Sequence, residues 1–301
     1  MKLLIKRSIN SLFQIDLWDL FYCKSNFDQF LKTKGKIFKN NKKIHYKKNN
    51  FFADPFILKV KKNNIQLLVE DFSFLEGAKL SSINFNFLSN TLKINNLVRG
   101  KHFSYPFLFK NKKEIYLFPE MSEERENIIF LKKNNKIKPI KNYLFGENVI
   151  DPTIVKYGKY YWLFCSFKNM GENKNLYLFY AKNIFDNWIA HPKNPILKNS
   201  NKARPAGNII LHKGKLYRPA QNFKDGYGSG LYLNLIEKLD KNDYFEKTLF
   251  KISPLEKKYN GIHHISFKDG YFVFDQKFTV YSIYKIIYYI LKKIYFKNYI
   301  N

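Results

Sequence analysis

The stretch FFADPFILKVKKNNIQLLVED, residues 51–71, shows the plan on which the chain is built. A polar residue and a proline precede a short apolar run, a turn of Lys and Asn follows, and a second apolar run ends on two acidic residues. Two apolar runs on either side of such a turn are typical of a β-hairpin. Because proline has no N–H to donate to a neighbouring strand, Pro55 is expected at the first position of the first strand.

The same plan recurs four more times along the chain. The repeats are FSYPFLFKNKKEIYLFPEM from Phe103, VIDPTIVKYGKYYWLFCS from Val149, ARPAGNIILHKGKLYRPAQ from Ala203 and IHHISFKDGYFVFDQ from Ile262. The residues that start the five hairpins are Asp54, Tyr105, Asp151, Arg204 and His264. Further strand-like runs lie between the hairpins, so each unit of roughly 50 residues holds four strands, which is the unit of a β-propeller. The sequence therefore predicts an all-β fold, a five-bladed β-propeller with short N-terminal and C-terminal extensions.

This repeat sets the expected domain organisation. Residues 1–50 are expected to supply a cap and a closing strand, with Trp18 as a packing residue, and residues 51–280 the propeller. The chain has 301 residues, of which 45% are hydrophobic, and this excludes a disordered protein. Cys23 and Cys165 are too few for a disulfide framework and have no spacing typical of a metal site.

The chain is strongly basic, with 53 Lys and Arg against 24 Asp and Glu and a formal net charge of +29. Part of this excess accompanies a general richness in Lys, Asn, Ile, Phe and Tyr, as in KKNN and KNNKK. The rest predicts attraction to phosphorylated substrates, anionic lipid or nucleic acid. Because the basic residues are scattered and no nucleic-acid-binding signature is present, no specific nucleic-acid partner is expected.

The two ends of the sequence give an expectation for where in the cell the protein lies. The start, MKLLIKRSINSLFQIDLWDLFY, is interrupted by Lys6, Arg7 and Asp16, so no signal peptide is expected. The sequence contains no run of 18 apolar residues, so no transmembrane helix is expected. Residues 281–301, YSIYKIIYYILKKIYFKNYIN, form a basic tail that would be amphipathic as a helix and suited to an anionic membrane surface. We expect a cytoplasmic protein that lies peripherally on the inner face of the membrane; the alternative for the tail is an element packed on the domain with solvated lysines.

A propeller brings the hairpins together at one place. The first strand of each blade lines the central channel, so the five hairpin starts are expected around one mouth. Since the second strand of each hairpin runs antiparallel to the first, its end returns to that mouth. The residues expected there are Glu70, Asp71, Glu120, Ser166, Arg218, Gln221 and Asp275. A ring of carboxylates, bases and tyrosines on an apolar scaffold indicates a binding or catalytic site.

The motifs FADPF, SYPFLF, YLFPE, DPT, NWIAHPKNPI, ARPAGN, LYRPAQN and YGSGL occur in this order. From Phe51 to Gln276 they resemble the N-terminal domain of plant glucosamine inositolphosphorylceramide transferases. That domain is similar, more remotely, to the five-bladed propellers of arabinanases, xylosidases and invertases. The plant proteins carry a glycosyltransferase domain after the propeller, and we do not expect such a domain within these 301 residues.

The resemblance implies roles for particular residues. In the related glycosidase propellers an Asp at the start of the first blade is base or nucleophile, a second Asp orients the sugar, and a Glu is the acid. Asp54 and Asp151 match the two aspartates. The fourth blade starts with Arg204 where those enzymes carry the acid, which leaves Glu120 or Glu70 for that role. Asp54, Asp151 and Glu120 are thus the candidate catalytic residues.

A second set of residues is expected to bind substrate. Arg204 and Arg218 stand on one hairpin, and guanidinium groups suit phosphate or carboxylate ligands. The candidate substrate-binding residues are Glu70, Asp71, Tyr105, Arg204, Arg218, Gln221, His263 and His264. The His263–His264 pair has no third ligand at a diagnostic spacing, so neither a metal nor another cofactor is expected. The alternatives are structural: Asp54 and Asp151 as turn residues that bind local backbone, and the two arginines as ion pairs with Glu120 or Asp275.

Three functions follow from these residues. The first is a glycosyltransferase-like enzyme of cell-envelope polysaccharide or glycolipid synthesis, whose substrate is a sugar, a sugar phosphate or a glycolipid. The second is a glycoside hydrolase or phosphorylase on the same fold, and the missing acid on the fourth blade weighs against it. The third is a non-catalytic sugar-binding module that works with a separate transferase.

Overall fold

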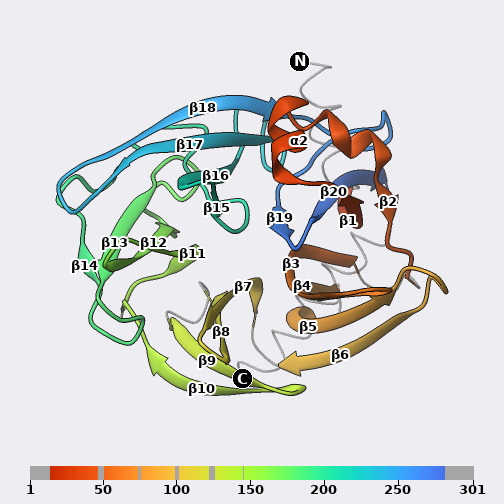
Figure 1. The fold of residues 1–301 in the computed structure, drawn as a ribbon, viewed down its shortest axis with the longest axis horizontal. Helices are drawn as coiled ribbons and strands as arrows, with labels where there is room; N and C mark the ends of the chain where they lie inside the picture. Colours follow the sequence, from red (N-terminus) through yellow and green to blue (C-terminus); the bar gives the residue numbers. More distant parts are fainter. Residues whose placement is uncertain are drawn as a thin grey trace, which may run out of the picture.

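The computed structural model describes residues 14–46, 51–73, 76–98, 102–121, 126–144 and 146–281. Within these ranges the chain forms five four-stranded antiparallel sheets around a central axis (Figure 1). The helices in the described ranges are α2 (Phe27–Lys32) and the 3-10 helix η1 (Lys36–Asn40). The predicted all-β, five-bladed propeller is therefore confirmed. Beyond Tyr281, the predicted basic tail lies outside the described residues.

Four of the blades follow the chain in order, each with its first strand innermost (Figure 1). Blade 1 is β3 (Phe51–Lys61), β4 (Asn64–Ser73), β5 (Gly77–Asn86) and β6 (Leu92–Val98). Blade 2 is β7 (Ser104–Asn111), β8 (Glu114–Glu120), β9 (Ile128–Lys133) and β10 (Lys136–Asn142). Blade 3 is β11 (Val149–Tyr157), β12 (Tyr160–Phe167), β13 (Tyr177–Ala181) and β14 (Ile189–Ala190). Blade 4 is β15 (Ile210–His212), β16 (Lys215–Gln221), β17 (Leu231–Leu239) and β18 (Tyr244–Ile252).

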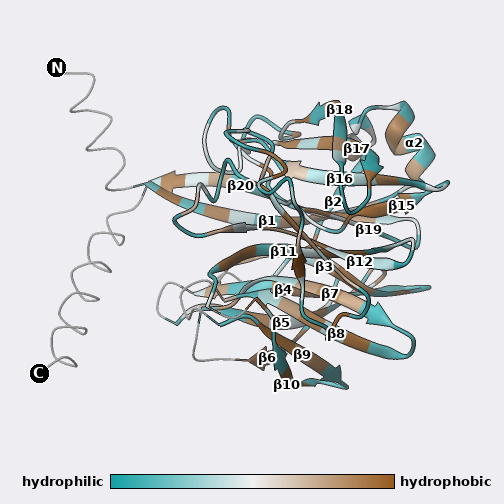
Figure 2. Cartoon of the chain, turned by 90° about the vertical axis from the view of Figure 1, so that its left-hand side faces the viewer, coloured by the Kyte–Doolittle hydropathy of each residue, from teal (hydrophilic) through white to brown (hydrophobic). Residues whose placement is uncertain are grey.

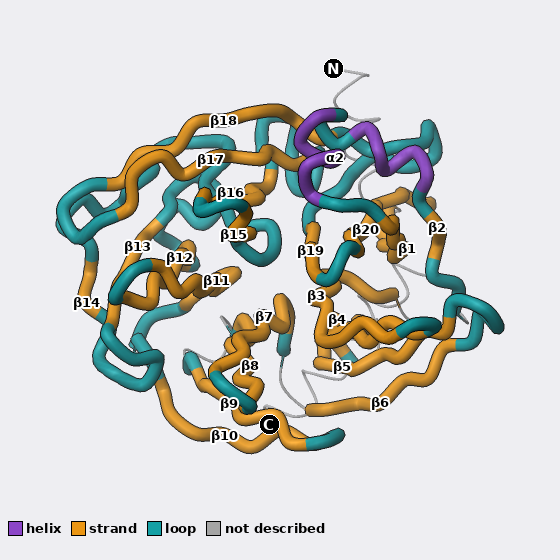
Figure 3. Tube along the Cα trace, viewed as in Figure 1, coloured by secondary structure: helices purple, strands orange, loops and turns teal. Residues whose placement is uncertain are grey.

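Blade 5 joins the two ends of the chain. Its inner strands β19 (Ile265–Lys268) and β20 (Tyr271–Tyr281) come from the end, and its outer strands β1 (Gln14–Lys24) and β2 (Lys42–Lys43) come from the start (Figure 3). β1 and β20 pair along their whole length, from Gln14 opposite Tyr281 to Lys24 opposite Tyr271. This pairing closes the ring of blades without covalent linkage.

Apolar side chains fill the spaces between neighbouring blades. One cluster runs across blades 1 to 3 and includes Phe56, Phe107 and Leu163. Another, with Phe30 of α2 and Phe272 of β20, fills the space between blades 4 and 5. In Figure 2 the strands carry the hydrophobic segments while most turns are hydrophilic. None of the helices in the described ranges has the length and apolar character to cross a membrane.

The prolines of the repeated motif do not stand at the first position of the first strands. The pairing registers of blades 1, 2 and 3 shift at Asp54-Pro55, Tyr105-Pro106 and Asp151-Pro152, so each dipeptide forms a bulge inside its strand. A bulge accommodates proline because the extra residue is unpaired, and this corrects the position expected from sequence. Asp54, Tyr105 and Asp151 have φ angles of 49°, 42° and 48°. Residues with side chains rarely adopt this left-handed region, and it persists where the surroundings hold it.

Acidic side chains of the preceding blade hold these three bulges. The N–H of Asp54 donates to Asp275 Oδ2 at 3.1 Å, and the N–H of Tyr105 donates to Asp54 Oδ2 at 3.3 Å. The N–H of Asp151 donates to Glu120 Oε2 at 3.3 Å. The carboxylates of blades 5, 1 and 2 thus bind the backbone of blades 1, 2 and 3. Asp54 therefore has a structural role between blades rather than within its own turn.

The junction of blades 4 and 5 yields a test of the fold. Gly207 has a φ of +121°, and a Cβ at this residue would lie 1.9 Å from the carbonyl oxygen of Ile265. We expect Gly207→Ala to lower the free energy of unfolding by about 3 kcal/mol or more, since backbone strain and a steric clash add. Gly214→Ala is the matched control, because its φ is +74° but a Cβ there meets nothing within 4 Å. Denaturant unfolding of both variants measures the difference, and equal losses would contradict the proposed packing.

Candidate functional site

A polar cavity of about 210 Å³ lies where the hairpins of the five blades begin. Its lining residues are Asp54, Glu70, His102, Ser104, Glu120, Asp151, Arg204, Gln221, Tyr227 and His263. All five blades contribute to this list. The volume is below the roughly 300–1,000 Å³ of sites for drug-sized ligands, so it suits a small polar group such as one sugar ring.

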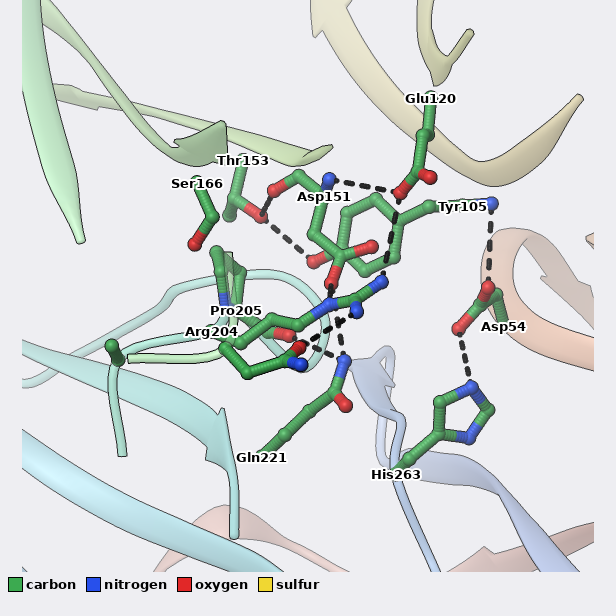
Figure 4. Close-up of polar contacts among 12 residues, drawn as sticks. Asp54, Tyr105, Glu120, Asp151, Thr153, Ser166, Arg204, Pro205, Gln221 and His263 are labelled. Atoms are coloured by element: carbon green, nitrogen blue, oxygen red, sulfur yellow. Dashed lines mark hydrogen bonds and ion pairs between the residues drawn. The ribbon is translucent and has the colours of Figure 1, made fainter. Parts of the chain in front are cut away.

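One side of the cavity is built on Asp54 of β3. The Nε2 atom of His263 lies 3.3 Å from Asp54 Oδ1, as Figure 4 shows. The other ring nitrogen of His263, Nδ1, lies 2.9 Å from Asp275 Oδ1. Asp275 is fully buried behind His263 and does not line the cavity. The histidine therefore connects a cavity carboxyl group to a buried one.

Glu70 of β4 lies beside Asp54 and shares a hydrogen bond with it, which couples the two carboxyl groups. Burial raises the pKa of Asp54 to about 7, since the nearby His263 offsets only part of that effect. Burial and the repulsion from Asp54 raise the pKa of Glu70 well above its ordinary value. At neutral pH this pair consequently holds a proton that ordinary carboxylates would have lost.

A second group of residues, from blades 2, 3 and 4, surrounds Asp151. Arg204 Nε lies 2.5 Å from Asp151 Oδ2, and the Gln221 side-chain amide donates to the same oxygen at 3.1 Å. Arg204 also lies 3.7 Å from Glu120 and donates to Asn173 at 3.2 Å. Figure 4 shows Asp151, Glu120, Arg204 and Gln221 together, apart from Asp54 and His263. The guanidinium is thus already surrounded by acceptors.

The pKa of Asp151 is raised to about 7. Burial is the main cause; the Arg204 guanidinium opposes it, and repulsion from and hydrogen bonding with Glu120 reinforce it. Asp54 and Asp151 therefore both have a pKa at which they can gain or lose a proton near neutral pH. General acid–base catalysis requires groups with such a pKa.

Asp54, His263 and Asp275 also form a group that could hold a metal ion, because their ligand atoms lie within 4.8 Å of one another. In the structure both ring nitrogens of His263 already face carboxylates. Asp275 accepts from the backbone N–H groups of His263, His264 and Asp54. These atoms satisfy one another through hydrogen bonds, so the donor set fits a hydrogen-bonded chain better than a metal centre.

Arg218 does not line the cavity, contrary to the expectation that it joins Arg204 there. It is buried in blade 4, where Nε and Nη2 donate to the two carboxylate oxygens of Glu246 at 2.7 and 2.8 Å. Its guanidinium also donates to the carbonyl oxygens of Lys202 and Ala203. Arg218 and Gln221 are three residues apart on one strand, so their side chains leave opposite faces. Arg218 therefore supports the backbone that leads to Arg204.

Three further candidates also point away from the cavity. Asp71 follows Glu70 on β4, and its carboxylate accepts from Ser81 Oγ at 2.8 Å. His264 follows His263 and is buried against the rings of Phe56 and Tyr105. In both cases the alternation of side chains between the faces of extended chain is the reason. Tyr105 turns its hydroxyl to Thr153 and Gly207, 2.7 and 2.8 Å away, and contributes its backbone N–H to Asp54 instead.

The structure adds residues that the repeated motif did not single out as candidates. His102 and Ser104 reach the cavity from just before and at the start of β7, and Tyr227 reaches it from the loop between β16 and β17. Tyr227 is 44% exposed and its ring lies 5.6 Å from the Arg204 guanidinium carbon. It also contacts the rings of Phe223 and His263. The sequence GYGSG indicates a turn here, and the tyrosine in it is an aromatic residue of the kind that stacks on sugar rings.

Comparison with known families identifies the chain. Residues 40–269 match the family model described as glucosamine inositolphosphorylceramide transferase 1, N-terminal. The chain belongs to this family. The match covers most of the propeller and includes every residue that lines the cavity.

Curated relatives carry the name of the same transferase. Glucosamine inositolphosphorylceramide transferase 1 of Arabidopsis thaliana is 31% identical over 236 residues, which cover 73% of this chain and 31% of that protein. The protein of the same name from Oryza sativa subsp. japonica is 34% identical over 151 residues, or 48% of this chain and 20% of that protein. The chain therefore spans less than a third of the length of these relatives.

Solved structures of glycan-degrading enzymes share the fold. The catalytic domain of an α-L-arabinofuranosidase from Coprinopsis cinerea matches with a TM-score of 0.57 at 10% identity, covering 75% of this chain and 90% of that one. An α-L-arabinofuranosidase from Podospora anserina matches with a TM-score of 0.56 at 12% identity, covering 71% and 76% of the two chains. At these identities the likeness concerns the propeller fold and not the chemistry.

The Arg218–Glu246 pair yields a stability prediction. Arg218→Met removes the guanidinium that binds the buried Glu246 carboxylate and leaves it with Lys202 Nζ, 3.8 Å away, so we expect a loss of about 3–5 kcal/mol in the free energy of unfolding. In the double variant Arg218→Met/Glu246→Leu no fully buried charge stays unpaired, so most of that loss should be recovered. Urea unfolding of the two variants and the wild type measures this. A double variant as unstable as the single one would refute the assignment of Arg218 to the scaffold.

The carboxyl pair of Asp54 and Glu70 yields a pH prediction. Because folding raises the pKa of both groups, the stability they contribute is fully present below about pH 4 and is lost as the pH rises through about 7. Each proton held only by the folded protein gives a slope of about −1.4 kcal/mol per pH unit. Glu70→Gln should flatten the fall in stability between pH 5 and 8, whereas the exposed Glu237→Gln should leave it unchanged. Thermal unfolding across this range is the measurement, and identical slopes in all three proteins would count against buried, coupled carboxyl groups.

Proposed function

We propose that this protein is a glycosyltransferase-like enzyme of glycolipid or cell-envelope polysaccharide synthesis, and that its cavity binds one sugar residue. The observation that carries the proposal is the pair of aspartates, Asp54 and Asp151, which line one polar cavity with pKa values raised to about 7. Each has a glutamate as its neighbour. Separate carboxyl groups able to accept and donate a proton are what the making or breaking of a glycosidic bond requires.

The two groups of residues divide the proposed reaction between them. Asp54 accepts the proton of an attacking hydroxyl group while the oxygen of that group bonds to the anomeric carbon of the bound sugar. The bond from this carbon to the leaving group breaks, and its electron pair goes to the leaving oxygen. The carboxyl pair of Asp151 and Glu120 donates a proton to that oxygen, so the leaving group departs as a neutral alcohol. Arg204 and Gln221 hold Asp151 in place during the step.

The charge of the cavity favours an amino sugar as the bound group. The lining contains four carboxyl groups, and the guanidinium of Arg204 is already paired with Asp151 and close to Glu120. A phosphate would have to displace these carboxylates, whereas an ammonium group would bind them directly. The name of the relatives, glucosamine inositolphosphorylceramide transferase, fits this preference. The sugar phosphate considered from the sequence is therefore the weaker candidate.

Location and partners follow the sequence expectations as part of this proposal. A glycolipid acceptor would be met at a membrane surface, and the strong positive charge of the chain would favour an anionic one. The cytoplasmic location, the membrane contact through residues 281–301 and a separate transferase partner stay predictions.

Calorimetric binding to three sugars tests the proposed site. We expect glucosamine to bind more tightly than glucose, and glucose 6-phosphate to bind weakest, because the cavity is rich in carboxyl groups. Tyr227→Ala should weaken glucosamine binding about fivefold, since aromatic contacts of this kind contribute around 1 kcal/mol. Tyr157→Ala, another exposed tyrosine, is the control and should leave binding unchanged. Tighter binding of the phosphate than of glucosamine would refute the amino-sugar preference.

The same variants separate an enzyme from a binding module. Asp54→Asn should retain sugar binding and lose turnover of a glucosamine donor by at least about a hundredfold, the usual contribution of a general base. Release of free sugar with water as the only acceptor would favour the hydrolase alternative. Binding without turnover under any condition would favour the non-catalytic module.

A further inference from the structure

We infer that Asp275 and His263 are positioning residues that hold Asp54 as the ionised, proton-accepting member of its carboxyl pair and leave the proton on Glu70. The inference rests on the proposed function for its chemical consequence, but the arrangement itself is a property of the free protein. It concerns three side chains that connect blade 5 to the cavity in the order Asp275, His263 and Asp54.

Asp275 is the fixed end of the chain. Its Oδ1 accepts from the backbone N–H groups of His263 and His264 at 3.2 and 3.0 Å and faces His263 Nδ1 at 2.9 Å. Its Oδ2 accepts from the N–H of Asp54 at 3.1 Å. These contacts and the adjacent imidazole lower its pKa although burial acts in the other direction. A fully buried carboxylate with this many donors is ionised and immobile, so Nδ1 of His263 must carry a proton.

His263 is held in one orientation by aromatic rings. The indole of Trp18, from the first strand of the described chain, lies 3.9 Å from the imidazole centroid at an angle of 34°. The ring of Tyr227 lies 5.5 Å away on the cavity side. With Nδ1 bound to Asp275, the other nitrogen is directed at Asp54 Oδ1. The closing strand of the propeller therefore fixes the geometry of a cavity carboxyl group.

The charges around the imidazole favour its protonated form. Burial would lower the pKa of His263, but the carboxylates of Asp275 and Asp54 outweigh it and raise the pKa above the ordinary value. The charged and titratable groups that face the Asp54–His263 contact from the surrounding elements are Glu70, Tyr105, Glu120, Asp151, Arg204, Tyr227 and Asp275, and Lys277 Nζ lies 6.0 Å from the centroid of the Trp18 ring. An imidazolium beside Asp54 stabilises the carboxylate form of Asp54. The proton of the Asp54–Glu70 pair therefore lies on Glu70.

This division of roles fits the proposed reaction. The carboxylate of Asp54 accepts the proton of the attacking hydroxyl group. The imidazolium of His263 keeps both of its N–H protons, which are directed at Asp275 and Asp54. The accepted proton then leaves through the hydrogen bond to Glu70, which releases its own proton to water. The Asp151–Glu120 pair regains its proton from water, so both carboxyl pairs return to their starting state, and no redox partner is needed.

The first experiment uses the full chain without any sugar. Histidine labelled with ¹⁵N should show both ring nitrogens of His263 protonated at pH 7, and ¹³C-labelled aspartate and glutamate should show that Asp54 loses its proton at a lower pH than Glu70. In His263→Gln the titration midpoint of Asp54 should rise by about one pH unit or more, because a nearby cation is lost. His191→Gln is the matched control, since His191 is also buried but its ring faces the carbonyl oxygen of Asp240. That variant should leave Asp54 unchanged.

Two results of this experiment would overturn the inference. One is a His263 that is neutral at pH 7 in the wild type, a measurement that needs no variant to fold. The other is a shift of the His263 signals on addition of equimolar Zn²⁺ or Ca²⁺, which would make the three residues metal ligands instead.

A second experiment follows the pH dependence of turnover with a 4-nitrophenyl glucosaminide. The acidic limb of kcat/KM should move upward by about one pH unit in His263→Gln and should stay in place in His191→Gln. An unmoved acidic limb in an active His263→Gln variant would refute the positioning role. Absence of turnover in the wild type would count against the proposed function alone, because the magnetic-resonance result stands without it.

Discussion

The interaction on which both fold and site depend is a carboxylate of one blade bound to the backbone N–H of a strained bulge in the next. Asp275, Asp54 and Glu120 make this contact to Asp54, Tyr105 and Asp151. Each contact satisfies a buried donor, and together they hold in place residues whose φ angles are otherwise disfavoured. Acidic groups are thereby kept at the channel mouth, where burial changes their chemistry.

Burial of several carboxyl groups in one place lowers the stability of the fold, and nearby cationic side chains offset this loss only in part. Arg204 faces Asp151 and His263 faces Asp54, yet the pKa of both aspartates is raised to about 7. A scaffold optimised only for stability would replace such groups by apolar ones. Their presence around a cavity lined by an exposed tyrosine is the main physical reason to regard this as a functional site.

The repeated hairpin made the propeller predictable, because two apolar runs around a turn recur five times. The same repeat placed Asp54, Asp151 and Glu120 at one mouth, as the structure shows. The direction of individual side chains was harder to predict. Arg218 and His264 stand near cavity residues in the sequence, but side chains alternate between the two faces of an extended chain, and these two point away from the cavity. Tyr227 lies on a loop outside the hairpin pattern, and the contact between His263 of blade 5 and Asp54 of blade 1 depends on how the two blades pack together. Contacts between blades are therefore what the sequence alone does not reveal.

The most direct test of the central claim is a crystal structure of the protein grown with glucosamine. The account predicts a sugar ring in the 210 Å³ cavity, with one face against Tyr227 and with polar groups on the carboxylates of Asp54 and Asp151. Because the fold holds these groups in place, the cavity residues should move little on binding. A sugar bound elsewhere on the propeller, or no sugar in the cavity at saturating concentration, would contradict the claim that the channel mouth is the site.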